Sequence, residues 1–338
     1  MTASLNQTEI EISVVIPTYQ RSRILSQSLK TLLTQDFPHR RYEIIIVSDG
    51  PDDGILNDVR EMKTRCSLLV LNQAHGGQAA ARNTGWQKAM GRVVLFLDDD
   101  LLCEPDLLTQ HMEAHGGEPC LAFGPILTFA ADAKNLASEV ISIHLNRYYD
   151  NLCPSRPLAW PEDACVRPNS SVARNILVRL GGFDERFYRG REDTDLGLRL
   201  WKAGIKFRFL PAAGVRQIHA KTAEELVRDA EDFGRNDILL SRKHRDYHPA
   251  RFGSLHKRAS LRTAIRQVLV RMPVSPDPVL RWAYYLFQRY NRPAIMRKVA
   301  LRLLSLRQTI TWYRAARREA GSWNGVLRIL KTRNVGPK

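Results

Sequence analysis

The sequence predicts an α/β protein in which a mostly parallel sheet has helices on both faces and a helical C-terminal extension follows. Between residues 11 and 97, short β-branched runs alternate with segments that have apolar residues at helical spacing. Residues 241–338 contain 23 Lys and Arg but only 3 Asp and Glu, whereas the first 240 residues contain 28 and 32. We therefore expect a catalytic or binding domain over residues 1–240 and a basic helical region over residues 241–338.

The predicted elements alternate along the chain. Residues 11–17 form a β-branched run that ends at a proline, which is typical of a buried strand. Further strands are expected at residues 42–47, 67–71, 93–97 and 206–210, and helices at residues 22–35, 55–64, 78–90 and 193–203. In such sheets the ligand lies beyond the carboxyl ends of the strands. Thr18, Asp49 and Asp98 come just after strand ends, so they are expected at the ligand site.

Composition excludes several classes of protein. With 44% apolar and 25% charged residues, the 338-residue chain is typical of a globular protein, not of a disordered or fibrous one. Five cysteines without a close Cys-x-x-Cys pair indicate neither a disulfide framework nor a zinc site, and they favour a reduced, cytoplasmic location. The N-terminus lacks the pattern of a signal peptide. No uncharged apolar stretch approaches the ~20 residues that a membrane-spanning helix needs.

The usual nucleotide-binding fingerprints are missing. The first predicted strand is followed by Gln20-Arg21 and not by Gly-x-Gly-x-x-Gly, and no Gly-x-x-x-x-Gly-Lys-Ser/Thr segment occurs. A ligand at the strand ends must therefore be held by carboxylates and a metal rather than by a glycine-rich loop.

Three adjacent carboxylates, Asp98, Asp99 and Asp100, follow the strand at residues 93–97. Neighbouring carboxylates repel one another unless a cation intervenes. Oxygen ligands suit Mg²⁺ or Mn²⁺, which commonly bridge protein carboxylates to a diphosphate. The alternative is a solvated acidic turn or a cluster that caps a helix.

Other polar segments are compatible with a site or with a purely structural role. Asp49 lies in a turn, where aspartate often caps the backbone. The small residues around Ala81 allow a ligand to approach closely, or allow tight packing of a helix on the sheet. Glu192 and Asp193 stand at the start of a predicted helix, whose dipole favours the ionised carboxylate. His219 is a metal ligand or a structural histidine.

Taken together, these segments resemble the family 2 glycosyltransferases with the GT-A fold, over about residues 11–220. The resemblance rests on six segments in order: Pro17-Thr18-Tyr19, Asp49-Gly50, Ala81-Arg82-Asn83, residues 97–100, Gly181-Gly182-Phe183 and Glu192-Asp193. The sequence departs from the family pattern at residues 48–51, where two acids followed by Gly-Ser are more usual.

The resemblance implies roles for particular residues. Those matching the donor-binding segments are Pro17, Thr18, Tyr19, Asp49, Ala81, Arg82, Asn83, Asp98 and Asp99. The metal, Mg²⁺ or Mn²⁺, would be held by Asp100 and Asp98, with His219 as a further ligand. The general base would be Asp193, ahead of Glu192.

The resemblance also implies an inverting transfer from a nucleotide-diphosphate sugar, a UDP-sugar in the first place, to a saccharide or lipid-linked acceptor. Cell-surface polysaccharide or glycolipid synthesis is the expected setting. The alternatives are a metal-dependent sugar nucleotidyltransferase and an inactive scaffold of the same fold.

The basic region has its own pattern. Apolar residues recur at 3–4 spacing in residues 261–269 and 296–313, and aromatic residues lie between Arg281 and Arg289. Arginine-rich helices with aromatic residues suit an anionic membrane surface, which predicts a peripheral protein on the inner face of the plasma membrane. A helical subdomain that packs on the core or in a homodimer is the alternative. Nucleic acid is not expected as a partner.

Overall fold

The computed structural model describes residues 10–51, 54, 59, 62, 64–128, 136–152, 158, 165–249, 267–289 and 294–331. The chain forms two compact units. The first comprises Met1–Phe129 and His144–His219, and the second comprises Ala130–Ile143 and Ala220–Lys338. Residue 240, where the charge pattern predicts the boundary, lies inside the helix α8 (Ala223–Lys243). This helix belongs to the second unit.

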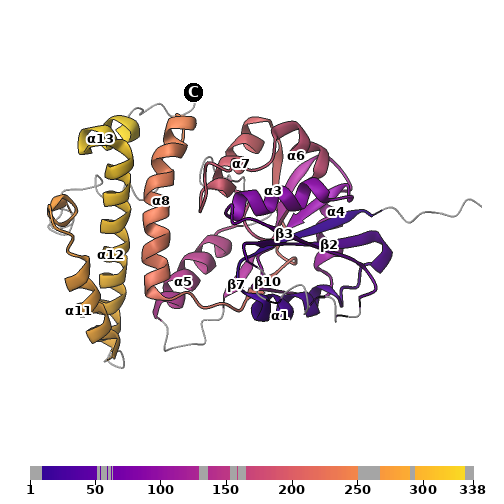
Figure 1. Cartoon of the computed structure of the whole chain (residues 1–338), viewed down its shortest axis with the longest axis horizontal. Coiled ribbons are helices and arrows are strands. Elements are labelled where there is room, and N and C mark those ends of the chain that lie inside the picture. The colour runs from indigo at the N-terminus through magenta and orange to yellow at the C-terminus, as the bar shows by residue number, and fades with distance from the viewer. Residues whose placement is uncertain are drawn as a thin grey trace, which may run out of the picture. The chain divides into compact units, whose positions relative to one another are not determined.

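The first unit is built on a seven-stranded sheet (Figure 1). Its order is β3 (Ser67–Gln73), β2 (Tyr42–Asp49), β1 (Ile12–Thr18), β4 (Val93–Phe96), β8 (Ser170–Ala173), β6 (Cys120–Phe123) and β9 (Lys206–Phe209). All neighbours are parallel except at β8, which is antiparallel to both β4 and β6. The prediction of a mostly parallel sheet is therefore confirmed.

A second, three-stranded sheet contains β5 (Leu101–Cys103), β10 (Val215–Gln217) and β7 (Ile126–Thr128) in that order. β5 directly follows the three aspartates, and β10 directly precedes Ile218 and His219. Because β10 pairs with β5, the segment that ends the first unit is brought beside the acidic triplet.

Helices cover both faces of the large sheet (Figure 1). Among the described residues, the helices of this unit include α1 (Ser22–Leu32), the short 3₁₀ helix η1 (His39–Arg41), α3 (Gln78–Lys88), α4 (Leu107–Ala114), the last part of α5 (Leu136–Asp150), α6 (Arg174–Leu180) and α7 (Glu192–Lys202). Side chains alternate across a strand, so Val14 packs with α1 and α4 while Val15 packs with α3, α6 and α7. Both faces are thus apolar and buried, as continuous β-branched runs require.

The helix predicted at residues 55–64 lies outside the described residues except for Val59, Met62 and Thr64. The acidic pair Glu192-Asp193 opens α7, as predicted.

The second unit is helical. It contains the first part of α5 (Leu136–Asp150), α8, α11 (Asp277–Arg289), α12 (Ala294–Ala320) and α13 (Trp323–Lys331). Thr222 and Glu225 form a capping box that begins α8. α8 and α12 approach closely at Gly234, where a Cβ atom would lie 2.2 Å from the carbonyl oxygen of Trp312.

Buried polar groups link the helices of this unit. Asp237 accepts hydrogen bonds from Tyr247 Oη at 2.9 Å and from Trp312 Nε1 at 2.7 Å. The guanidinium of Arg307 is buried and pairs with Asp277 at 2.8 Å and with Glu224 at 3.0 Å. These pairs connect α8, α11 and α12, so this basic region has a specific packed core.

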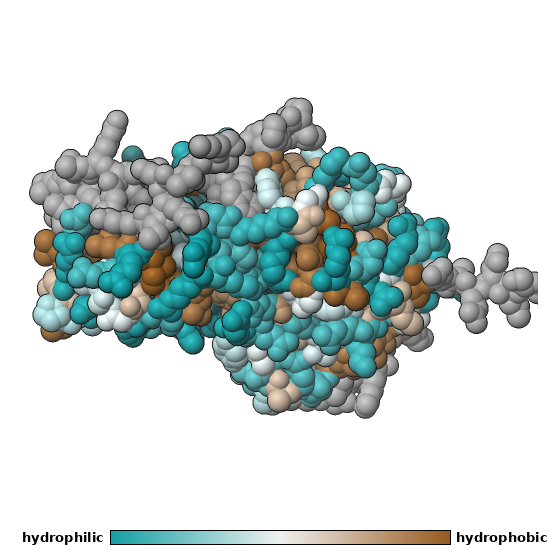
Figure 2. Space-filling view, turned by 90° about the horizontal axis from the view of Figure 1, so that it is seen from above, coloured by the Kyte–Doolittle hydropathy of each residue, from teal (hydrophilic) through white to brown (hydrophobic). Residues whose placement is uncertain are grey.

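The predicted apolar stripe at residues 296–313 lies in α12, and Ile310 and Tyr313 are buried in an apolar cluster. Residues 261–266 of the other stripe lie outside the described residues. Tyr284 is only 1% exposed, so the prediction that the aromatic residues between Arg281 and Arg289 face a membrane is wrong for this residue. Trp282, in contrast, is 68% exposed. The space-filling view shows hydrophobic and hydrophilic residues side by side on the visible face of the helical unit (Figure 2). Within the described residues, no helix has the length and apolar character needed to span a bilayer.

Candidate active site

The polar residues predicted at the ligand site gather at one edge of the large sheet. β1, β2 and β4 run parallel and end at this edge: Thr18 and Asp49 are the last residues of β1 and β2, and the triplet Asp98–Asp100 comes shortly after β4. The placement follows from parallel pairing, which brings the carboxyl ends of neighbouring strands together.

The carboxylate of Asp49 is buried and fully engaged within the protein. It accepts hydrogen bonds from the backbone N–H groups of Gly76 at 2.8 Å and Gly77 at 2.9 Å. Gln73 Nε2 and His75 Nδ1 also lie 2.8 Å from its oxygens. Asp49 therefore holds the loop between β3 and α3 in place, which is the capping role considered from the sequence.

Aromatic rings surround this loop. Tyr19 is 43% exposed and stacks on His75, with ring centroids 4.4 Å apart. His75 in turn makes an edge-on contact with Tyr188 at 5.5 Å. Glycine is required beneath the rings: a Cβ at Gly50 would lie 2.8 Å from the Tyr19 ring, and one at Gly77 would lie 2.4 Å from the Tyr188 carbonyl oxygen. The result is a partly exposed aromatic surface beside a buried carboxylate.

Asp99 faces the protein interior. It accepts hydrogen bonds from Thr18 Oγ1 and from Arg21 Nη1, both at 2.8 Å. Burial is the largest influence on Asp99 and raises the pKa of its carboxyl to about 7, although Arg21 and Thr18 oppose the shift. Asp99 thus ties β1 and the start of α1 to the acidic turn.

Asp98 and Asp100 are the carboxylates available to a metal. Asp100 Oδ1 is buried and has no hydrogen-bond partner among the described residues, while Asp98 is a quarter exposed. Burial, followed by the charge of Asp98, raises the pKa of Asp100. His219 acts electrostatically on Asp100, and the N–H of the preceding Ile218 donates to the Asp100 carbonyl oxygen at 2.9 Å. The structure therefore brings His219 close to the acidic triplet.

These residues fit a divalent cation that is shared with a substrate phosphate. No group of three His, Cys, Asp or Glu that could enclose a metal by itself occurs in the described ranges. Mg²⁺, however, usually takes one or two protein carboxylates together with water and substrate phosphates. The orphaned oxygen of Asp100 is a ligand of the required kind.

Arg82 connects the two acidic clusters. Its buried guanidinium donates from Nη2 to Asp98 Oδ1 at 3.0 Å and from Nη1 to Glu192 Oε1 at 2.8 Å. The amide of Gln78 is satisfied when Nε2 donates to Glu192 at 3.1 Å and Oε1 accepts from Arg82 at 2.9 Å. Arg82 Nε and Glu192 Oε2 are buried without a hydrogen-bond partner in the described part of the chain. The carboxyl end of β4 and the amino end of α7 therefore belong to one site.

The two acids of α7 have different surroundings. Glu192 is buried, and burial together with the charge of Asp193 raises its pKa, while Arg82 opposes the shift. Asp193 is half-buried, and its carboxylate accepts hydrogen bonds from Thr194 N at 2.6 Å and from the thiol of Cys165 at 3.1 Å. Asp193 is thus the more accessible carboxylate of the pair.

Asn83 and Ala81 support the site from within the protein. Asn83 Nδ2 donates to the Phe183 carbonyl and to Glu185, while Oδ1 accepts from Trp86 Nε1 and Phe183 N, at 2.8 to 2.9 Å. Its hydrogen-bonding groups are therefore used to hold the loop after α6. Ala81 is fully buried in the apolar cluster between α3 and the sheet.

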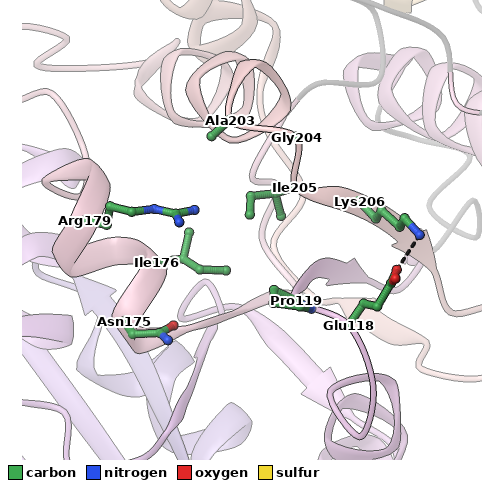
Figure 3. Close-up of a pocket in the computed structure, with 9 residues that line it drawn as sticks. All are labelled: Glu118, Pro119, Asn175, Ile176, Arg179, Ala203, Gly204, Ile205 and Lys206. Carbon is green, nitrogen blue, oxygen red and sulfur yellow. Dashed lines mark hydrogen bonds and ion pairs between the residues drawn. The ribbon is translucent and has the colours of Figure 1, made fainter.

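Two adjoining cavities of the first unit lie away from these residues. One of about 480 Å³ is lined by Arg179, Lys206 and Glu118 among others, and the last two form an ion pair across its side (Figure 3). The other, of about 350 Å³, shares Glu118 with it. Both lie where β6 and β9 begin, at the opposite edge of the sheet. No predicted site residue lines either cavity.

Several residues of the site were not predicted. Arg21 lies just after the first strand, but no sequence pattern indicates that its side chain binds Asp99. His75, Tyr188 and Cys165 reach the site only through tertiary contacts. Their spacing in the chain contains no periodic signal that could have identified them.

Comparison with known proteins agrees with this arrangement. The family described as glycosyl transferase family group 2 matches residues 93–314, about two thirds of the chain. The family described as glycosyl transferase family 2 matches residues 13–157. The chain is 29% identical over 248 residues to the glycosyltransferase YfnE of Bacillus subtilis, covering 59% of this chain and 62% of that protein. It is 29% identical over 233 residues to chondroitin synthase of Escherichia coli, covering 60% of this chain and 34% of that protein. The chain thus spans less than two thirds of the length of these curated relatives.

Solved structures share the fold. Residues 1–349 of TarS from S. aureus superpose with a TM-score of 0.52 at 17% identity, covering 88% of this chain and 90% of that one. A mannosyltransferase of Pyrobaculum calidifontis, PcManGT, superposes with a TM-score of 0.58 at 17% identity, covering 88% of this chain and 86% of that one. The predicted GT-A fold is therefore confirmed, and with the family match over two thirds of its length, the chain belongs to the family 2 glycosyltransferases.

Proposed function

We propose that this protein transfers a sugar from a nucleotide-diphosphate sugar to an acceptor hydroxyl, with inversion and with the help of a divalent cation. One observation carries the proposal: Arg82 contacts both Asp98 and Glu192. The acids expected to bind the metal and the acids expected to supply the base therefore lie next to each other. Glycosyl transfer by a single displacement needs both functions, one for the leaving diphosphate and one for the attacking hydroxyl.

The donor is expected to bind along the carboxyl edge of β1, β2 and β4. Tyr19 offers an exposed ring on which a base can stack, beside Asp49. Structural neighbours support a nucleotide-sugar donor, because TarS was solved with UDP and with UDP-GlcNAc, and PcManGT with GDP-Man and Mn²⁺. We propose a UDP-sugar as the first donor to test.

Asp100 and Asp98 would hold the cation, with His219 beside them. When bound, Mg²⁺ or Mn²⁺ would neutralise the charge that develops on the leaving diphosphate. Arg21 and Thr18 keep Asp99 turned inward. Asp99 thereby fixes the acidic turn so that its two neighbours face the ligand.

Asp193 would accept the proton of the acceptor hydroxyl. As that O–H bond breaks, the oxygen forms a bond to the anomeric carbon, the bond from this carbon to the diphosphate oxygen breaks, and the nucleoside diphosphate leaves. Attack from the face opposite the leaving group inverts the anomeric configuration. Glu192 would orient Arg82 rather than take the proton, because it is buried and its Oε1 already accepts from Arg82.

The direct test is release of nucleoside diphosphate from a panel of UDP- and GDP-sugars, with Mg²⁺, with Mn²⁺ and with a chelator. Slow hydrolysis in the absence of acceptor, dependent on the cation, is expected for one donor. The anomeric proton coupling of a transferred product would establish inversion. Formation of a nucleotide sugar from a sugar phosphate, without transfer, would instead assign a nucleotidyltransferase.

We further propose that the second unit contacts an anionic membrane surface, where a lipid-linked acceptor would be found. Val279, Trp282 and Leu286 of α11 recur at 3–4 spacing and are all exposed. Arg281, which also pairs with Glu224 at 3.5 Å, lies between Val279 and Trp282, and Arg289 follows Leu286. Exposed apolar side chains beside cationic ones suit the interface of an anionic bilayer.

A further inference from the structure

Cys165 contacts the carboxylate of Asp193 directly. Its Sγ lies 3.1 Å from Asp193 Oδ2, and the thiol is buried. The next residue, Val166, donates its backbone N–H to the Asp193 carbonyl oxygen at 3.0 Å. The segment that contains these two residues is therefore attached to Asp193 at both its side chain and its backbone.

The other oxygen of Asp193 is engaged by Thr194. Asp193 Oδ1 accepts from Thr194 N at 2.6 Å and from Thr194 Oγ1 at 3.2 Å. A carboxylate oxygen can accept about two hydrogen bonds in its plane. Thr194 thus occupies Oδ1, whereas Cys165 leaves one position on Oδ2. The two oxygens of this carboxylate are not equivalent.

A thiol in this place acts as a hydrogen-bond donor. Burial, and then the negative charge of Asp193, raises the pKa of the Cys165 thiol. The S–H bond therefore stays intact at neutral pH, and its proton is donated to Asp193 Oδ2, while Thr194 Oγ1 donates to Cys165 Sγ at 3.9 Å. A thiol is a weak donor, so it can orient a carboxylate without holding it as firmly as a hydroxyl would.

We propose that Cys165 is a positioning residue that fixes the Asp193 carboxylate and leaves one lone pair of Oδ2 as the place where the acceptor's proton is received. The inference rests on the proposed role of Asp193 as general base. It assigns the reactive oxygen within that residue and explains how the carboxylate is held at the start of α7, where Thr194 alone would restrain only Oδ1.

The test compares Cys165→Ala and Cys165→Ser in the intact protein, using nucleoside diphosphate release as the readout. Removing a donor favours the protonated carboxylate. Cys165→Ala should therefore move the acidic limb of the kcat–pH profile upward by about half a pH unit and lower kcat by about tenfold. The donor KM should stay within about twofold. Cys165→Ser retains a donor and should restore most of kcat and the position of the acidic limb.

Cys120→Ala is the matched control, because Cys120 is also buried but contacts the Ala114 carbonyl oxygen and not the site. It should leave the profile unchanged even if it lowers stability. An unmoved profile in Cys165→Ala, or a shift equal to that of Cys120→Ala, would overturn the positioning role. If Asp193→Asn retains normal turnover, the proposed base is wrong. If Asp193→Asn is inactive while Cys165→Ala is normal, only the positioning role fails.

Discussion

Arg82 has a buried guanidinium between two carboxylates that belong to different elements, Asp98 after β4 and Glu192 in α7. Burial alone would lower the pKa of an arginine, but the charges of Asp98 and Glu192 outweigh this effect and raise it. A permanently charged group therefore balances two of the acids around the site. Asp100 reaches a permanent cation only through Oδ2, which lies 3.8 Å from Arg21, and its Oδ1 has no hydrogen-bond partner among the described residues.

At the metal position, Asp100→Ala should abolish the thermal stabilisation that Mn²⁺ and a nucleoside diphosphate produce together. The diphosphate would then face Asp98 without a bridging cation. Asp36→Ala, which removes an exposed acid on the same unit, should respond to metal and nucleotide like the unaltered protein. Metal-dependent binding that persists in Asp100→Ala, measured by calorimetry, would exclude Asp100 as the main ligand.

At the base position, Asp193→Asn keeps the shape of the side chain but cannot accept a proton at neutral pH. Turnover should fall by about 10²-fold or more while donor affinity stays within a few-fold. Glu192→Gln is the informative comparison, because it alters the partner of Arg82 and should weaken donor binding as well. Survival of turnover in Asp193→Asn with its loss in Glu192→Gln would transfer the role of base to Glu192.

At the scale of elements, the sequence predicted β1 to β4 and β9 together with α1, α3 and α7, but it missed α5 and α8, which are 15 and 21 residues long. β1, β2, β3 and β4 have continuous apolar runs, and α3 and α7 begin close to the predicted residues. β8 has the sequence SSVA and joins the sheet between β4 and β6, far from both in the chain. Its four residues are small and half of them are polar, so β8 has neither an apolar run nor a period that could identify it.

The same contrast applies to the site. Residues at or just after a strand end, such as Asp49 and Asp98, could be located from the rule for parallel sheets. The partners that give them a role, including Arg21, His75 and Cys165, could not, because tertiary packing brings them there.

The contact between α3 and β1 gives a stability prediction. A Cβ at Gly85 would lie 2.3 Å from Val15 Cγ1, and Val15 is buried in the sheet and cannot move aside. Gly85→Ala should therefore lower the free energy of unfolding by about 1–3 kcal/mol, despite the better helix propensity of alanine. Gly117→Ala, with no atom within 4 Å of the added Cβ, should change it by less than about 0.5 kcal/mol. Equal effects in urea unfolding would contradict the close contact.

A buried network between α4 and β8 gives a pH prediction. Ser171 Oγ lies 2.8 Å from His111 Nδ1 and 2.9 Å from His115 Nε2, and His111 Nε2 lies 3.0 Å from Asn169 Oδ1. The network is satisfied by neutral imidazoles, and burial lowers the pKa of each histidine to about 4.

Because an unfolded histidine binds a proton near pH 6.5, the folded state should lose stability as the pH falls from about 6.5 to about 4. The loss should reach about 2 kcal/mol per histidine at pH 5. In urea unfolding at several pH values, His111→Gln should reduce this slope, and His39→Gln, in the 3₁₀ helix, should not. A slope that is unchanged in His111→Gln would remove this network as its source.

At the scale of the whole molecule, the basic residues of the second unit predict salt-sensitive binding to anionic vesicles. Each cation near such a surface contributes about 1 kcal/mol, and screening by salt weakens this contribution. The double variant Val279→Ser/Trp282→Ser should bind less, whereas Val178→Ser, at an exposed apolar position of the first unit, should bind normally. Sedimentation with anionic and neutral vesicles at several salt concentrations measures both effects. Equal binding to both vesicle types, or none to either, would contradict membrane contact.

Removal of all residues after 245 would also remove the packing partners of α8 in the second unit. A loss of vesicle binding could then result from unfolding, so point variants are used instead. Ile238 of α8 is fully buried against residues of α12 and α13.

The division of the chain into units also has a consequence for biosynthesis. Leu136 and Ala137, at the start of α5, pack with Leu226 of α8 and Leu304 of α12. In the sequence, residues 144–219 of the first unit separate α5 from α8 and α12. A ribosome that adds about 5–20 residues per second would release this stretch of α5 on the order of ten seconds before α12 exists. The nascent protein therefore carries an uncovered apolar helix face for that interval. Chaperones that bind nascent chains would find their target at residues 136–143, and the helical unit can close only after translation has passed α12.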